Sequence, residues 1–145
     1  MKLSTKMRYG ARGLLELALS YDQGPLSLSE IAEREEISTK YLESLFGILR
    51  SGGLVYRARG SQGGYALARA PREITLREVF EVLEGSEAFV PCTDDHAVCG
   101  RWADCVTQEV WARMYAAAMQ VLEEATLADL AERAREKQSQ SRYDI

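Results

Sequence analysis

Three cysteines lie close together in a polar stretch of this chain, at Cys92, Cys99 and Cys105. Their spacing, C-x6-C-x5-C, differs from the C-x2-C pairs of zinc ribbons and supplies three thiolates rather than four. Thiolates six and seven positions apart on one loop can converge on a single metal centre, because closing short loops costs little entropy. The cysteines are therefore candidate ligands of a metal or cluster, or reactive thiols.

The composition limits the class of protein. A chain of 145 residues with 46% hydrophobic and 28% charged residues suits one compact domain with an appended helix. It contains no apolar run of the roughly 20 residues that a membrane span needs, and residues 1–10 lack the apolar stretch of a signal peptide. We expect a cytoplasmic protein with no membrane partner. In a reducing compartment, three clustered cysteines favour metal or redox chemistry over a disulfide framework.

The net charge of −4 hides a separation of charge along the chain. Residues 1–15 carry four basic side chains and no acid, and residues 47–72 carry five arginines and no acid. Residues 73–105 reverse this pattern, with eight acids against two arginines. Because phosphate binding needs local positive potential rather than a basic average, the two basic segments are candidate nucleic-acid surfaces.

Hydrophobic periodicity and helix-capping motifs predict the elements that position these segments. Apolar residues at helical spacing predict a first helix over residues 5–19. Ser27 and Glu30 form a capping-box motif that predicts a second helix to about Glu36. Ser38 then caps a third helix that ends at the glycine pair of residues 52–53. Two short helices joined by a tight turn indicate a helix-turn-helix.

The third helix and the hairpin after it supply the predicted DNA contacts. Burying the apolar side chains of this helix turns its polar residues towards solvent, as in a recognition helix. Residues 54–58 and 65–67 are predicted strands around a glycine-rich hairpin, whose tip could enter a minor groove as a wing. The predicted contacts are Ser38, Thr39, Lys40, Tyr41, Glu43 and Ser44 on the helix, with Arg59 and Gln62 on the wing.

The part of the sequence that follows the wing predicts a dimerisation unit. Thr75 and Glu78 form a second capping-box motif, which begins a connecting helix that ends at Gly85. Residues 106–122 form a helix with a broad apolar face that one small domain would not bury alone. We expect a mainly α fold with a small β wing (α+β). Its parts are a winged helix-turn-helix domain (1–84), a cysteine loop (85–105), a dimerisation helix with a short terminal helix that Thr126 caps (106–136), and a flexible tail (137–145).

Nearly the whole chain resembles the winged-helix iron–sulfur transcriptional regulators that include IscR and NsrR. The resemblance is carried by the start MKLSTKMRYG, the run ISTKYLESLFGILRSGGLV, the wing RGSQGGY and the segment CVTQEVW. It implies a homodimer in which the long helices pair and place two winged domains on a partly palindromic double-stranded DNA operator. It also implies that Cys92, Cys99 and Cys105 hold an iron–sulfur cluster, for which we favour [2Fe–2S] over [4Fe–4S].

The resemblance leaves the fourth cluster ligand open. IscR-like proteins place a histidine three residues after the third cysteine, where this chain has Gln108. NsrR-like proteins use an aspartate of the partner's first helix, where this chain has Arg8. His96, the only histidine, lies within the cysteine loop and is the candidate fourth ligand, with nearby carboxylates as alternatives.

We therefore expect a transcriptional regulator that senses cluster status, redox state or nitric oxide, and not an enzyme, since no nucleophile–base pair or phosphate loop is visible. Two alternatives remain open. One is a zinc or thiol-redox regulator on the same scaffold. The other is a small iron–sulfur electron carrier, for which a helix-turn-helix would have no purpose.

Overall fold

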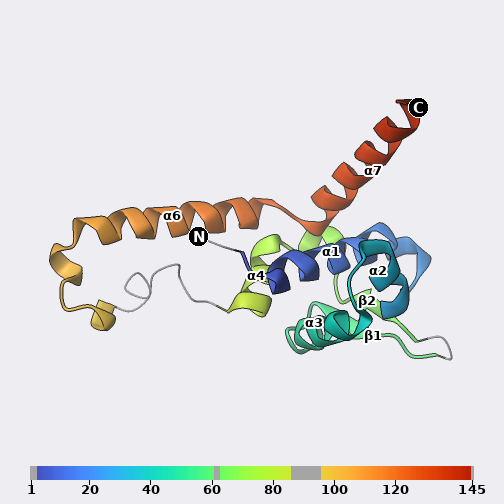
Figure 1. Cartoon of the computed structure of the whole chain (residues 1–145), viewed down its shortest axis with the longest axis horizontal. Helices are drawn as coiled ribbons and strands as arrows, with labels where there is room; N and C mark the ends of the chain where they lie inside the picture. Colours follow the sequence, from blue (N-terminus) through green and yellow to red (C-terminus); the bar gives the residue numbers. More distant parts are fainter. Residues whose placement is uncertain (1–2, 61–62, 86–95, 145) are drawn as a thin grey trace.

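The structure is a computed structural model and describes residues 3–60, 63–85 and 96–144. Within these ranges the chain is mainly helical with one two-stranded sheet, as predicted (Figure 1). The helices are α1 (Thr5–Leu19), α2 (Leu28–Glu35), α3 (Thr39–Ser51), α4 (Leu76–Glu84), α6 (Val106–Glu124) and α7 (Leu127–Tyr143). Short 3-10 turns are η1 (Tyr21–Gln23), η2 (Pro71–Glu73), η3 (His96–Val98) and η4 (Trp102–Asp104), and the strands are β1 (Val55–Arg57) and β2 (Tyr65–Leu67).

Side-chain caps fix where the helices begin. Ser27, Thr75 and Thr126 each form a reciprocal capping box with the third residue of the following helix, so the predicted starts of α2, α4 and α7 are confirmed. The Ser38 hydroxyl accepts a hydrogen bond from the Tyr41 amide at 3.1 Å and begins α3. Each cap satisfies an N–H group that the first helical turn leaves without a partner.

The core lies between α1, α3, α4 and the wing. Leu14, Phe46 and Val79 are fully buried there. The Phe46 ring packs edge-on against Tyr65 of the wing, with 5.1 Å between ring centroids. Elements of the predicted dimerisation unit also contribute to this core, because Met119 of α6 and Leu127 of α7 are buried in it. The domain formed by α1–α4 and the wing and the α6–α7 junction therefore form one packed unit.

The wing is tied to the start of α2. Strands β1 and β2 are antiparallel, and an additional bridge joins Leu26 to Tyr65 through two backbone hydrogen bonds of 3.0 and 2.7 Å. Gly64 lies beside this bridge with φ +121°, and a Cβ at that position would lie 2.8 Å from the Leu26 carbonyl oxygen. Only glycine fits this backbone conformation and this close approach.

The long helix α6 extends away from the rest of the molecule, and α7 leaves the junction in a different direction (Figure 1). Met119 is the only buried residue of α6. Its side chain lies near the C-terminal end of the helix, where α6 packs against α4. The described helices include none that is both long and apolar enough to cross a membrane.

The C-terminal segment differs from its prediction. Residues 137–143, predicted to belong to a flexible tail, continue α7 to Tyr143. The segment has no apolar stripe to signal a buried face, but it contains neither glycine nor proline, and most of its residues favour helices. The Thr126 capping box starts this helix, and an ion pair of 2.9 Å between Arg133 and Glu136 adds to it.

Candidate nucleic-acid interface and cysteine site

The first turns of α3 present polar side chains to solvent. Thr39, Lys40, Glu43 and Ser44 are exposed, while the opposite side of the helix is buried through Leu42 and its apolar neighbours. Ser38, also exposed, caps the helix at this end. The structure thus brings five of the six predicted helix residues onto one open surface, with the first-turn amides at its edge.

Tyr41 has a different environment. Its hydroxyl shares a hydrogen bond of 3.0 Å with the Thr5 hydroxyl of α1. Its ring meets Tyr9 edge-on, with centroids 5.9 Å apart. The residue is half-buried and joins α3 to α1, and these contacts help to position α3. Because Thr5 is 36 residues away from Tyr41 in the sequence, no local pattern could predict this contact.

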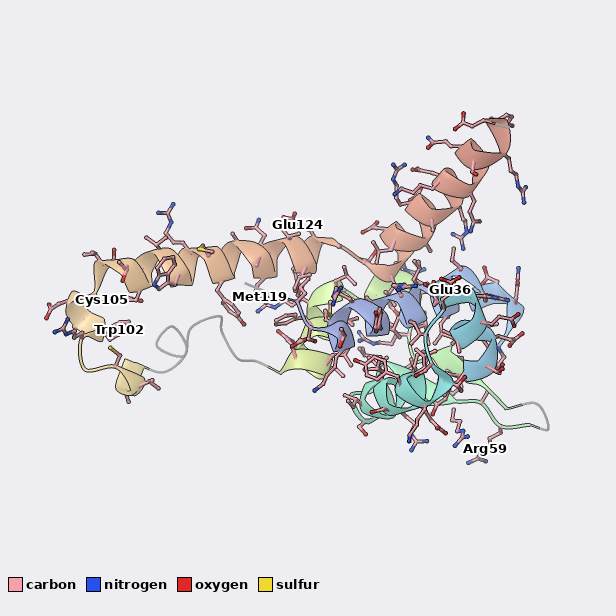
Figure 2. The ribbon with its side chains drawn as sticks, in the orientation of Figure 1. Glu36, Arg59, Trp102, Cys105, Met119 and Glu124 are labelled. Atoms are coloured by element: carbon pink, nitrogen blue, oxygen red, sulfur yellow. The ribbon has the colours of Figure 1, made fainter. Side chains whose placement is uncertain are left out.

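The wing places further cationic and aromatic groups near α3. Arg59 is exposed at the same edge of the molecule as α3 and opposite α7 (Figure 2). Tyr56 and Arg57 are also exposed on β1, and neither was among the predicted contacts. The Arg57 guanidinium lies 6.0 Å from the Tyr65 ring centroid. The predicted contact Gln62 lies outside the described residues.

The basic side chains divide into paired and unpaired groups. Arg12 forms a 2.7 Å ion pair with Glu35, which ties α1 to α2 rather than facing a ligand. By contrast, Lys40, Arg50 and Arg59 form no ion pair with any carboxylate in the described part of the chain. Their charge remains available to phosphate, so the surface formed by α3 and the wing carries cations that could bind a nucleic-acid backbone despite the acidic average.

Cys99 and Cys105 lie at the far end of α6. Cys99 and Cys105 are half-buried thiols without a disulfide, and Cys92 lies outside the described residues. Two backbone hydrogen bonds connect them: the Trp102 amide donates to the Cys99 carbonyl at 3.2 Å, and the Cys105 amide donates to the Trp102 carbonyl at 3.4 Å. Two consecutive turns therefore fix the backbone between the two thiols. Figure 2 shows Cys105 and Trp102 at the end of α6 opposite Glu124.

Cys105 is the N-cap residue of α6, and its surroundings favour a thiolate. Its sulfur lies 3.2 Å from the Thr107 hydroxyl. That hydroxyl, and next the backbone N–H of Gln108, lower the pKa of the Cys105 thiol below its ordinary value. An open pocket of about 460 Å³ lies beside the sulfur and is lined in part by Arg101 and Asp104. A thiolate in an accessible site of this kind is suited to metal ligation or to oxidation.

An iron–sulfur cluster is the cofactor that the resemblance implies, and the donor chemistry of the described thiols fits it. Cys99 and Cys105 supply soft sulfur ligands, and the lowered pKa of the Cys105 thiol favours the ionised form that a metal requires. Among described residues, no three His, Cys, Asp or Glu side chains are grouped as around a metal ion. Cys92 and the side chain of the candidate fourth ligand, His96, fall outside that description.

The similarity of this chain to known proteins is consistent with a DNA-binding surface on α3 and the wing. The sequence profile of the Rrf2 family, described as iron-dependent transcriptional regulators, matches residues 3–133. Protein rrf2 of Nitratidesulfovibrio vulgaris is 41% identical over 130 residues, which cover 90% of this chain and 87% of that protein. The structure of T. potens IscR matches with a TM-score of 0.79 and 41% identity, over 95% of this chain and 91% of that one. CymR, the global cysteine regulator of B. subtilis, matches with a TM-score of 0.75 and 40% identity, over 91% and 97% of the chains.

Proposed function

We propose, because this chain belongs to the Rrf2 family of winged-helix transcriptional regulators, that it acts as a homodimer whose operator affinity depends on the state of its three cysteines. Regulation of transcription, rather than catalysis, is the activity by which its relatives are named. The observation that carries the sensing step is the place of Cys105 at the N-cap of α6. A change at this sulfur acts directly on the helix that leads to the DNA-binding domain.

The homodimer is supported by the exposed apolar face of α6. Val110, Trp111 and Met114 are between 40% and 46% exposed, and Val121 is 65% exposed. A helix with such a face is stable in water when a second apolar surface covers it. Pairing this face with the same face of a second copy forms a two-fold interface and sets the separation of the two α3 helices.

The dimer is tested by changing the face and a position beside it. Met114→Glu places a charge in the proposed interface, and Arg113→Glu introduces the same side chain at an exposed polar position of the same helix. Sedimentation equilibrium should give a monomer or a much weaker dimer for Met114→Glu, and an unchanged dimer for Arg113→Glu. A monomeric parent chain, or a Met114→Glu protein that dimerises as the parent does, contradicts the proposed interface.

Contacts of α6 connect the cysteines to the DNA-binding domain. Arg77 of α4 pairs with Glu123 of α6 at 3.7 Å, and the Leu76 amide donates to the Ala125 carbonyl at 2.8 Å. At the other end of α4, Glu84 accepts a hydrogen bond from the hydroxyl of Ser4, the cap of α1. Helix α4 is therefore held between α6 and α1, and the cysteine loop leaves from its end. A coupling of about 1–3 kcal/mol through these contacts would change operator affinity roughly 5–150-fold.

The group that we propose at the cysteines is a [2Fe–2S] cluster held by Cys92, Cys99 and Cys105, with His96 as the candidate fourth ligand. The assembly and loss of such a cluster depend on iron supply, oxidants and nitric oxide. Cys105 would hold it through a thiolate that the Thr107 hydroxyl stabilises. Its presence or absence would then be transmitted to the first turn of α6.

Operator binding tests the proposal. DNA selected from a random pool by the parent protein, purified without oxygen, serves as the operator. The affinity is then measured for the cluster-loaded protein, for the apo-protein and for Cys105→Ser. Ser139→Ala, an exposed change on α7, is the control. We expect the loaded protein and the control to differ from the apo-protein and Cys105→Ser by about 5-fold or more. Equal affinity in all four samples contradicts cysteine-dependent regulation.

A second candidate is a thiol-redox or zinc regulator without iron. It is favoured by the lowered pKa of the accessible Cys105 thiol, and by the similarity to CymR, which is described as a cysteine regulator. Protein purified without oxygen separates the two. A coloured protein with stoichiometric iron and sulfide supports the cluster. A colourless protein with stoichiometric zinc, or one whose operator affinity changes with a reversible disulfide, supports the second candidate.

A further inference from the structure

A pocket of about 360 Å³ lies where the end of α1, η2 and the first turns of α7 meet. Four alanines and one proline form its apolar wall, and Tyr21, Asp22, Arg72 and Arg135 complete the lining. Two of the alanines, Ala18 and Ala131, belong to the buried core, so the wall is rigid and small side chains leave the space open. The pocket has no residue in common with the cysteine site or with the exposed surface of α3.

The two arginines of this pocket lack counterions. Neither Arg72 nor Arg135 forms an ion pair or a side-chain hydrogen bond within the described residues. Their neighbours do: Arg69 pairs with Glu78 at 2.6 Å, and Arg133 pairs with Glu136 at 2.9 Å. Arg72 and Arg135 come from elements more than sixty positions apart in the sequence, and the fold brings both unpaired arginines to the lining of one pocket.

The lining has the charges that a small organic acid requires. Two guanidinium groups against one carboxylate leave the pocket with a net positive charge. Guanidinium groups bind carboxylate and phosphate oxygens in pairs of parallel hydrogen bonds. The Asp22 carboxylate can accept from a hydroxyl or ammonium group of the same ligand, and the Tyr21 ring offers a flat side wall.

We propose that this pocket binds a small organic anion, in which a carboxylate or phosphate lies between Arg72 and Arg135 and a hydroxyl or ammonium group faces Asp22. The ligand would join η2 to α7. These two elements flank the connection between α4 and the α6–α7 junction, so an occupied pocket would strengthen the attachment of α7 to the DNA-binding domain. The site is independent of the cysteines and gives the regulator a second input.

Thermal unfolding of the DNA-free full chain tests this site. Glycerol 3-phosphate is the phosphate probe, malate is the carboxylate probe, and sodium chloride at matched ionic strength reports non-specific screening. At about ten times its Kd, a bound anion should raise Tm by roughly 3–6 °C in the parent chain. The rise should saturate, and it should be lost in Arg72→Gln and in Arg135→Gln. Arg142→Gln, an exposed change near the end of α7, should retain it.

The outcomes show whether the pocket binds the phosphate probe, the carboxylate probe or neither. A saturable shift with only one organic anion supports the site and identifies the group that it prefers. No saturable shift with either probe in the parent chain overturns the proposal. So does a shift equal to that of sodium chloride, or a shift that persists in both pocket variants. Far-UV circular dichroism of each variant checks that the exposed arginine changes leave the helical content unaltered.

Discussion

Thr75 and Thr126, the N-cap residues of α4 and α7, pair with each other in an isolated antiparallel bridge. The Leu76 amide donates to the Ala125 carbonyl at 2.8 Å beside this bridge. Each threonine also forms the capping box of its own helix. The start of the connecting helix and the junction of the two C-terminal helices are therefore fixed to each other through backbone hydrogen bonds, while each threonine side chain caps its own helix.

Removal of the Thr126 cap should loosen this junction. Thr126→Ala removes the hydroxyl that accepts from the Asp129 amide at 3.1 Å, whereas Thr126→Ser keeps a hydroxyl in the same place. We expect a loss of about 1 kcal/mol in the free energy of unfolding for alanine and a much smaller loss for serine. Urea unfolding followed by circular dichroism measures both. Equal stability of the two variants would show that the cap contributes nothing.

Gly13 sets the distance between α1 and α3. A Cβ at this position would lie 2.8 Å from Cε2 of Phe46, whose ring is fully buried and cannot move aside. Gly13→Ala should destabilise the chain by about 1–3 kcal/mol through overpacking. A Cβ at Gly47, in the interior of α3, would meet no other part of the molecule within 4 Å outside the backbone of its own helix, so Gly47→Ala should stabilise by up to about 1 kcal/mol. Urea unfolding should therefore show a lower free energy of unfolding for Gly13→Ala and a higher one for Gly47→Ala. Equal losses in the two variants contradict the packing argument.

The carboxyl group of Glu16 should make stability depend on pH. Burial first, and then a hydrogen bond with Glu35, raise the pKa of Glu16 above its ordinary 4.5, and Arg34 opposes this in part. Arg12 faces the same group of charges through its ion pair with Glu35. Because the pKa is raised in the folded state, protonation of Glu16 favours folding. This contribution is present at pH 4.5 and below, and it is lost as pH rises through the raised value.

The Glu16→Gln variant isolates that contribution. It should gain stability relative to the parent chain at neutral pH, and the gain should shrink as pH falls towards 4.5. Glu132→Gln, at an exposed position of α7, is the control and should show no such trend. Urea unfolding at a series of pH values measures both differences. A gain for Glu16→Gln that is the same at every pH contradicts the assignment.

The elements that sequence could predict are those with local signals. The capping boxes at Ser27, Thr75 and Thr126 involve residues three positions apart, so the starts of their helices follow from the sequence alone. The same holds for the exposed face of α3, because burial of Leu42 and Phe46 fixes which positions remain outside. Periodicity also predicted the exposed apolar face of α6.

Contacts between distant residues, and helices without a buried stripe, escaped prediction. The bond of Tyr41 to Thr5 was not predicted, because it depends on how α1 packs; the predicted contact of Tyr41 with DNA remains a prediction. The extension of α7 beyond residue 136 was missed because an exposed helix shows no apolar periodicity. The lack of a counterion at Arg135, likewise, depends on which carboxylates the fold brings near, and the sequence does not specify that.

The reactivity of Cys105 should depend on its neighbour Thr107. In a protein whose only thiol is Cys105, through Cys92→Ser and Cys99→Ser, the rate of iodoacetamide reaction should rise with pH about a midpoint below that of an ordinary thiol. Thr107→Val removes the hydroxyl that lies 3.2 Å from the sulfur and should move this midpoint upward, since that hydroxyl lowers the pKa most. Thr107→Ser keeps a hydroxyl and should keep the midpoint. If valine and serine give the same pH profile, the hydroxyl does not stabilise the thiolate.

Glu43 and Arg59 should affect DNA binding in different ways. Arg59 is an exposed cation on the wing, so Arg59→Ala should weaken binding to every sequence. It should also reduce by about one the number of counterions released on binding, which sets the salt dependence of the affinity. Glu43 is an exposed carboxylate on α3, which repels phosphate but can accept from a cytosine amino group. Glu43→Ala should therefore retain affinity and broaden the range of sequences bound.

Selection of bound sequences from a random DNA pool, at two salt concentrations, measures both effects. Glu33→Ala, which removes an exposed carboxylate from α2, controls for the change in net charge and should leave the selected sequences unaltered. An unchanged site preference for Glu43→Ala would remove Glu43 from the recognition surface. If Glu33→Ala broadens the range to the same extent, the loss of a negative charge near DNA explains the effect, and direct recognition of a base by Glu43 does not.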